Sequence, residues 1–140
     1  MVNLNAPEQK TGPTEATSFR WLPTGAEGLD AMLTLIAGAE RTVCFEMYIF
    51  TPGPLAERFR DTLIAARRRG ARVQVLLDAF GSIGLPSTFW NPLIQLGGEL
   101  RWFNPFRATE RYGRRNHRKL LVVDGTEAIV GGFNVGTAYH

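Results

Sequence analysis

The chain has 140 residues, of which 44% are hydrophobic and 21% are charged, and it carries a formal net charge of +3. These values are ordinary for one soluble globular domain with a workable core. The sequence has no apolar run of the roughly 18 residues that a transmembrane helix needs, and its N-terminus lacks the apolar segment of a secretory signal, so any membrane contact is expected to be peripheral.

The order of the predicted elements indicates the fold class. Residues 1–17 are polar and contain Pro7, Gly12 and Pro13, so we expect a loose tail before a domain over residues 18–140. Periodicity and turn residues predict strands over 19–22, 42–50, 72–78 and 99–103, and helices over 28–38, 55–69 and 87–96. Strands that alternate with helices predict an α/β domain with a largely parallel or mixed central sheet flanked by helices.

Three side chains on these strands have competing interpretations. Cys44 is the single cysteine, which excludes an internal disulfide, and we expect it to be a buried small side chain. Glu46 interrupts an apolar strand, so it needs a cationic partner near a phosphate site, or His117, unless it lies at a solvent-facing edge. Asp78 ends its strand where α/β sheets place ligands, although a loop-capping aspartate would occupy the same position.

The region from residue 117 to residue 134 has the most informative pattern. His117 and Lys119 begin a predicted strand over 117–123, Asp124 begins a turn, and a second strand follows over 127–130. Residues two apart on a strand share a face, so His117 and Lys119 are expected side by side, with Asp124 on the opposite face. The hairpin is expected to return residues 131–134 to the same place.

These residue types suit phosphodiester chemistry. An imidazole can act as nucleophile or general acid, and an ammonium group can neutralise phosphate oxygens. Gly131 and Gly132 have no Cβ and let the backbone approach a ligand, while Asn134 offers an amide donor. A histidine and a lysine alone would more often be ordinary surface residues of a hairpin, but the other residues at fixed offsets argue against that. No carboxylates or histidines occur at ligand spacing, so we expect neither a metal nor a cofactor.

Five arginines lie between residues 107 and 118, just ahead of this hairpin and at its first step. Among them, Arg115 is a candidate for substrate binding. A basic rim beside a phosphate site favours an anionic partner, either a lipid headgroup or nucleic acid. A solvated basic loop of an arginine-rich protein is the alternative.

The pattern from His117 to Asn134 resembles the HxKx4Dx6GGxN signature of the phospholipase D superfamily. Residues 46–50 and 70–78, followed by Gly81 and Ser82, are similar to bacterial cardiolipin synthases, as is the Gly-Gly form of the motif, where nucleases of the superfamily more often have Gly-Ser. The resemblance covers roughly residues 19–136 and corresponds to the N-terminal half of such an enzyme.

The resemblance implies a phosphatidyltransferase that acts on a phospholipid such as phosphatidylglycerol. His117 would form a phosphohistidine, Lys119 and Asn134 would bind phosphate oxygens, and Asp124 would be a supporting catalytic residue. Gly131, Gly132, Glu46 and Arg115 would contribute to phosphate or substrate binding. The expected location is cytoplasmic, at the anionic inner face of the membrane.

Enzymes of this superfamily combine two such motifs in one site, and this chain carries one. We therefore expect the second motif to come from a homodimer or from sequence beyond His140. Two alternatives remain open. One is a homodimeric phosphodiesterase or nuclease of the same superfamily, although nucleic acid is the less favoured partner. The other is a non-catalytic domain that binds anionic lipid or nucleic acid.

Overall fold

The computed structural model describes residues 18–105 and 114–136. The expected N-terminal tail and most of the basic loop lie outside the described residues. The elements are α1 (Gly25–Gly38), β1 (Thr42–Met47), α2 (Pro54–Arg68), β2 (Arg72–Asp78), α3 (Asn91–Gln95), β3 (Glu99–Phe103), β4 (Leu120–Val123) and β5 (Glu127–Val130).

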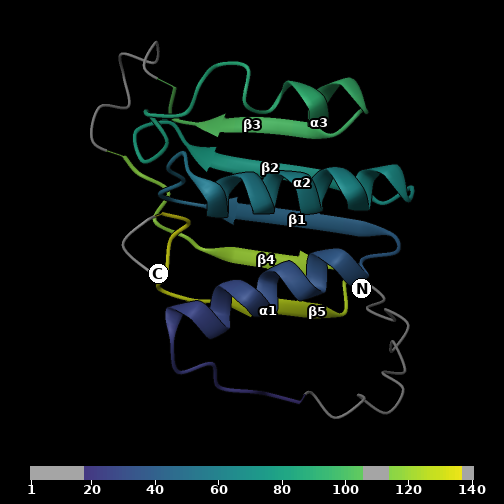
Figure 1. Cartoon of the computed structure of the whole chain (residues 1–140). Helices are drawn as coiled ribbons and strands as arrows, with labels where there is room; N and C mark the ends of the chain where they lie inside the picture. Colours follow the sequence, from purple (N-terminus) through teal and green to yellow (C-terminus); the bar gives the residue numbers. More distant parts are fainter. Residues whose placement is uncertain (1–17, 106–113, 137–140) are drawn as a thin grey trace, which may run out of the picture.

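The strands form one mixed sheet in the order β3-β2-β1-β4-β5 (Figure 1). β1 is parallel to β2, and β2 is parallel to β3. β4 is antiparallel to both β1 and β5. The predicted α/β class with a mixed sheet and flanking helices is therefore confirmed.

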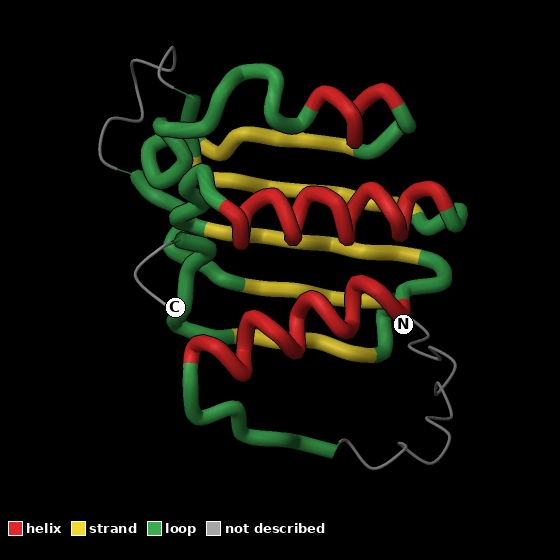
Figure 2. Tube along the Cα trace, in the orientation of Figure 1, coloured by secondary structure: helices red, strands yellow, loops and turns green. Residues whose placement is uncertain are grey.

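The described helices pack on one face of the sheet. The chain moves from β1 to β2 to β3 in one direction, and right-handed crossovers then place α2 and α3 on the same side. Figure 2 shows α1 and α2 running across that face. The core between helices and sheet includes the stacked rings of Phe45 and Phe59, whose centroids are 5.5 Å apart, together with the buried Ile36 and Leu63.

Alternate residues of β1 face opposite sides of the sheet. Val43, Phe45 and Met47 are buried beneath the helices, while Cys44 and Glu46 point to the other face. No described helix covers that other face. The prediction that Cys44 is buried is therefore wrong: its thiol is exposed, with Sγ 3.6 Å from the side-chain oxygen of Gln74.

Several predicted boundaries differ from the structure. Residues 19–22 form no strand, and the first strand ends at Met47 rather than residue 50. The helix expected over 87–96 is reduced to α3, because a proline is accepted only in the first turn and Pro92 stands there. None of the described helices is long and apolar enough to span a bilayer.

Candidate active site

The residues of the His117–Asn134 pattern, apart from Asp124, lie where several strands of the sheet end or begin. β1, β2 and β3 all end at this edge, β4 begins there and β5 ends there (Figure 1). Leu120 pairs with Glu46 near the end of β1, so the residues just before β4 lie beside the residues just after β1. The strand predicted over 117–123 starts only at Leu120, and residues 117–119 precede it without regular secondary structure.

His117 and Lys119 are in direct contact. The Nζ atom of Lys119 lies 3.1 Å from Nδ1 of His117 and donates to its backbone oxygen at 2.8 Å. The predicted side-by-side placement of imidazole and ammonium is confirmed. His117 is exposed, whereas Lys119 is only 2% exposed. The imidazole ring of His117 is therefore open to solvent, while the ammonium group in contact with it is buried.

The environment of Lys119 favours an anion. Burial lowers the pKa of its ammonium group. Among the described residues, no carboxylate forms an ion pair with it. Its neighbours are the ring of His117 and the ring of Tyr48, whose centroid is 5.0 Å from Nζ. A buried cation without a carboxylate is stabilised by any anion that binds beside it.

Tyr48 is a site residue that the sequence pattern did not single out for a role. Its ring centroid lies 4.6 Å from that of His117. It follows β1 directly, at the end where β4 begins, so the antiparallel pairing of the two strands brings it to the motif. Its signals in the sequence are its position two residues after Glu46 and its place in the segment 46–50, which resembles cardiolipin synthases.

The segment after β5 returns to the same edge, as predicted. The backbone N–H of Gly131 donates to the carbonyl of Lys119 at 3.1 Å. A Cβ at Gly131 or Gly132 would meet no atom within 4 Å, so both glycines border open space. This arrangement leaves their backbone accessible to a ligand.

Asn134 is buried and is fixed to the chain that follows β1. Its side-chain oxygen accepts from the backbone N–H of Ile49 at 3.0 Å. The next residue, Val135, donates to the carbonyl of Ile49 and accepts from the N–H of Thr51. With its oxygen engaged in this way, the amide NH2 of Asn134 is the part that can donate to a phosphate oxygen.

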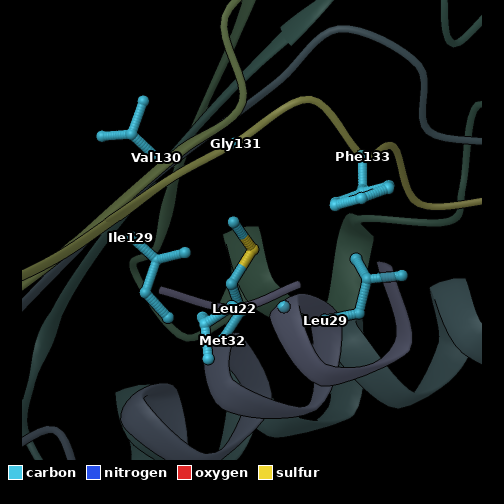
Figure 3. Close-up of a pocket in the computed structure, with 8 residues that line it drawn as sticks. Leu22, Leu29, Met32, Ile129, Val130, Gly131 and Phe133 are labelled. Carbon is cyan, nitrogen blue, oxygen red and sulfur yellow. The ribbon is translucent and has the colours of Figure 1, made fainter. Parts of the chain in front are cut away.

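Phe133 holds this segment from the helix side. A Cβ at Gly25 would come within 2.8 Å of its ring, so the first turn of α1 must be small here. Figure 3 shows Phe133 above Leu29, beside a small apolar pocket that is also lined by Met32 and Ile129. This packing anchors the residue immediately before Asn134.

The structure places Asp124 at the far end of β4 from His117. Its carboxylate accepts three backbone N–H groups, from Glu40 at 2.9 Å and from Arg41 and Thr42 at 2.7 Å each. These hydrogen bonds lower the pKa of Asp124. The carboxylate therefore ties the β4–β5 turn to the start of β1 and does not reach the side chains of His117 and Lys119.

Glu46 is brought near the site but not to His117. It occupies a central strand rather than an edge, and its carboxylate accepts from the side-chain amide of Asn116. Arg118 lies 3.4 Å from the same carboxylate. The ionic partner of Glu46 is thus Arg118, the residue between His117 and Lys119. The sequence had predicted a cationic partner of this kind as one of the alternatives.

Two further side chains complete this edge. Asp78 is fully buried, and its carboxylate accepts from the backbone N–H groups of Phe80, Gly81 and Asn116. It therefore has the loop-capping role, and it also ties that loop to the residue before His117.

The guanidinium of Arg115 lies over the ring of Phe80, 4.7 Å from its centroid.

The fold is that of phospholipase D-like proteins. A solved structure of the phospholipase D family member Nuc from Salmonella typhimurium aligns with a TM-score of 0.59 and 23% identity, over 79% of this chain and 66% of that one. NucT from Helicobacter pylori aligns with a TM-score of 0.61 and 15% identity, over 82% of this chain and 71% of that one. At these identities the likeness concerns the fold.

A family model described as cardiolipin synthase, PLD-like domain, matches residues 32–139, and the chain belongs to this family. It is 35% identical to the major cardiolipin synthase ClsA of Bacillus subtilis over 90% of this chain and 27% of that protein. It is 31% identical to cardiolipin synthase B of Escherichia coli K12 over 86% of this chain and 30% of that protein. The chain thus spans less than a third of the length of these relatives.

Proposed function

We propose that this domain provides half of the active site of a phosphatidyltransferase of the cardiolipin synthase type. The observation that carries the proposal is the exposed imidazole of His117 in contact with the buried ammonium of Lys119. Membership of the cardiolipin synthase family supports the proposed substrate class, a phospholipid such as phosphatidylglycerol.

In the proposed first step, a ring nitrogen of His117 attacks the phosphorus of a phosphatidylglycerol phosphodiester. An N–P bond forms, the P–O bond to the leaving glycerol breaks, and a general acid protonates that glycerol. Lys119 and the amide NH2 of Asn134 neutralise and orient the phosphate oxygens as negative charge shifts onto them.

In the second step, the hydroxyl group of another phosphatidylglycerol attacks the same phosphorus. The N–P bond breaks, the hydroxyl proton passes to the base that served as acid before, and cardiolipin is released. No group of the chain's own motif is left to serve as this acid and base, because His117 is the nucleophile. We propose that a histidine of a second motif supplies it, either from a second copy of the chain or from further sequence in the natural protein.

The substrate class is tested by offering two substrates to separate aliquots of one protein preparation. The protein is incubated with phosphatidylglycerol vesicles and, separately, with single-stranded DNA, and His117→Ala is the matched control. The proposal predicts cardiolipin and glycerol as products, with no turnover by the variant. Cleavage of DNA without cardiolipin formation would instead favour a phosphodiesterase or nuclease.

The origin of the second motif is tested by sedimentation of the same samples. A dimer with turnover supports assembly from two copies. A monomer without turnover supports completion by further sequence. A strictly monomeric sample with full turnover would contradict the need for two motifs.

A further inference from the structure

The loop between β2 and α3 presents apolar side chains to solvent at the edge that holds His117. Phe80 is 51% exposed and Ile83 is 70% exposed. In Figure 1 this loop follows the end of β2, at the same end of the sheet's strands as the start of β4. Exposed single apolar residues are common, but an aromatic and a branched aliphatic residue on one loop beside a candidate lipid site form a candidate contact surface.

This loop is held in place by several contacts. The carboxylate of Asp78 accepts from the backbone N–H groups of Phe80 and Gly81, and the carbonyl of Gly81 accepts from the N–H of Phe50 at 3.2 Å. A Cβ at Gly81 would overlap the carbonyl oxygen of Tyr48, so the loop backbone sits directly against the end of β1. The exposure of Phe80 and Ile83 is therefore fixed by the backbone.

One cationic side chain contacts Phe80, and two more lie within three residues of that cation in the sequence. The guanidinium of Arg115 lies over the ring of Phe80, and Arg114 beside it is exposed. Arg118 is 73% exposed at its side chain, with Glu46 as its ion-pair partner. An apolar tip beside arginines matches the boundary between anionic headgroups and acyl chains, where the apolar groups insert and the cations remain at the phosphates.

We propose that the β2–α3 loop, residues 79–86, docks on the surface of an anionic phospholipid bilayer. Phe80 and Ile83 enter the acyl boundary, and Arg115 contacts lipid phosphates. The inference rests on the proposed function for the identity of the lipid. Docking through this loop would bring headgroup phosphates to the end of the sheet where His117 is exposed, which is what the proposed reaction requires.

The experiment measures binding of the full 140-residue chain to vesicles by co-sedimentation, with no turnover required. Vesicles of phosphatidylcholine with and without phosphatidylglycerol are compared. Ile83→Ser should weaken partitioning to the anionic vesicles roughly tenfold, because it removes the aliphatic side chain that enters the acyl boundary of the bilayer. Arg115→Gln should reduce the preference for phosphatidylglycerol several-fold.

Ile94→Ser is the matched control. Ile94 is 47% exposed and lies on α3, which precedes the start of β3 at the opposite edge of the sheet. Its partitioning should equal that of the unmodified protein. Ile83→Trp should bind at least as tightly as the unmodified protein, because tryptophan favours the membrane interface, and a variant that merely unfolds would not show this.

Three results would overturn the proposal. Ile83→Ser could bind like the unmodified protein, Ile94→Ser could lose as much binding as Ile83→Ser, or Ile83→Ser could dissociate a dimer in lipid-free sedimentation. The last result would assign the loop to a second copy of the chain. Loop-dependent vesicle binding by a chain that cleaves DNA and forms no cardiolipin would refute the proposed function and leave the docking surface intact, so the two failures are distinguishable.

Discussion

The buried carboxylate of Asp78 accepts a hydrogen bond from the backbone N–H of Asn116 at 2.9 Å. Asn116 is the residue before His117, and its side-chain amide donates to Glu46. One carboxylate at the end of β2 and one on β1 therefore fix the chain that presents the imidazole. The position of His117 depends on two strands that are distant from it in sequence.

Replacing Asp78 tests this positioning. In Asp78→Asn, an NH2 group replaces one of the oxygens that accept backbone N–H groups, so at least one hydrogen bond is lost. We expect the free energy of unfolding to fall by about 2 kcal/mol and kcat to fall about 10- to 100-fold, as for a displaced catalytic group.

Asp30→Asn is the control for this change. Asp30 forms an exposed ion pair with Arg58, so its loss should change the unfolding free energy by less than about 0.5 kcal/mol. Chemical denaturation and vesicle turnover measure both effects. Asp78→Asn with unchanged stability and turnover would show that other contacts position His117.

Lys119 is expected to act through its compact charge. Lys119→Ala should reduce kcat roughly 10²- to 10³-fold, because a phosphate oxyanion in the transition state loses its cation. Lys119→Arg should restore little, since a larger planar guanidinium does not fit a side-chain position that is 2% exposed. Steady-state kinetics on phosphatidylglycerol vesicles measures both variants. Full activity of Lys119→Arg would mean that any positive charge suffices.

Asp124 is expected to act on stability, with a defined pH dependence. Three backbone N–H groups hold its pKa below the ordinary value of 3.8. The ionised carboxylate therefore stabilises the fold above pH 3.8, and this contribution is lost as the pH falls through the lowered pKa. Asp124→Asn should have a lower Tm at neutral pH, with the difference closing in acid.

Glu127→Gln, at the exposed start of β5, is the control for the Asp124 variant. Its Tm should follow that of the unmodified protein across the same pH range. Thermal unfolding by circular dichroism from neutral pH to below pH 3.8 provides the data. A difference for Asp124→Asn that persists unchanged in acid would contradict the assigned role of its hydrogen bonds.

Chelation should leave turnover intact. In the described part of the chain, no three histidine, cysteine or acidic side chains come together in a metal-binding group. The proposed covalent route through His117 uses Lys119 for charge neutralisation. Turnover measured with and without EDTA should agree; loss on chelation that Mg²⁺ or Zn²⁺ restores would contradict this route.

The local part of the site was predictable from the sequence. The contact of His117 with Lys119 was predicted correctly, although the strand invoked for it begins only at Leu120. The turn residues after Val123 correctly predicted the hairpin that returns Gly131 to Lys119, because short stretches of sequence specify turn chemistry.

The long-range part was not predictable in the same way. Tyr48 joins the site because β4 pairs antiparallel with β1, and Cys44 is exposed because the described helices lie on one face. The residue pattern of one strand does not determine which strand will pair with it. It also does not determine which face of the sheet the helices will cover. The sequence left Asp78 as either a ligand-binding residue or a loop cap. The structure supports the loop cap, because the carboxylate accepts backbone N–H groups from two separate segments.

The central claim is that His117 carries the covalent intermediate. The most direct measurement is rapid quenching of a catalytically competent assembly in alkaline denaturant, which preserves a base-stable, acid-labile phospho-adduct, followed by mapping of the adduct by mass spectrometry at alkaline pH. The account predicts phosphorus on the ring of His117, and no adduct in His117→Ala. An adduct on a histidine of the second motif would make His117 the general acid, and an adduct on any other residue would contradict the proposed mechanism.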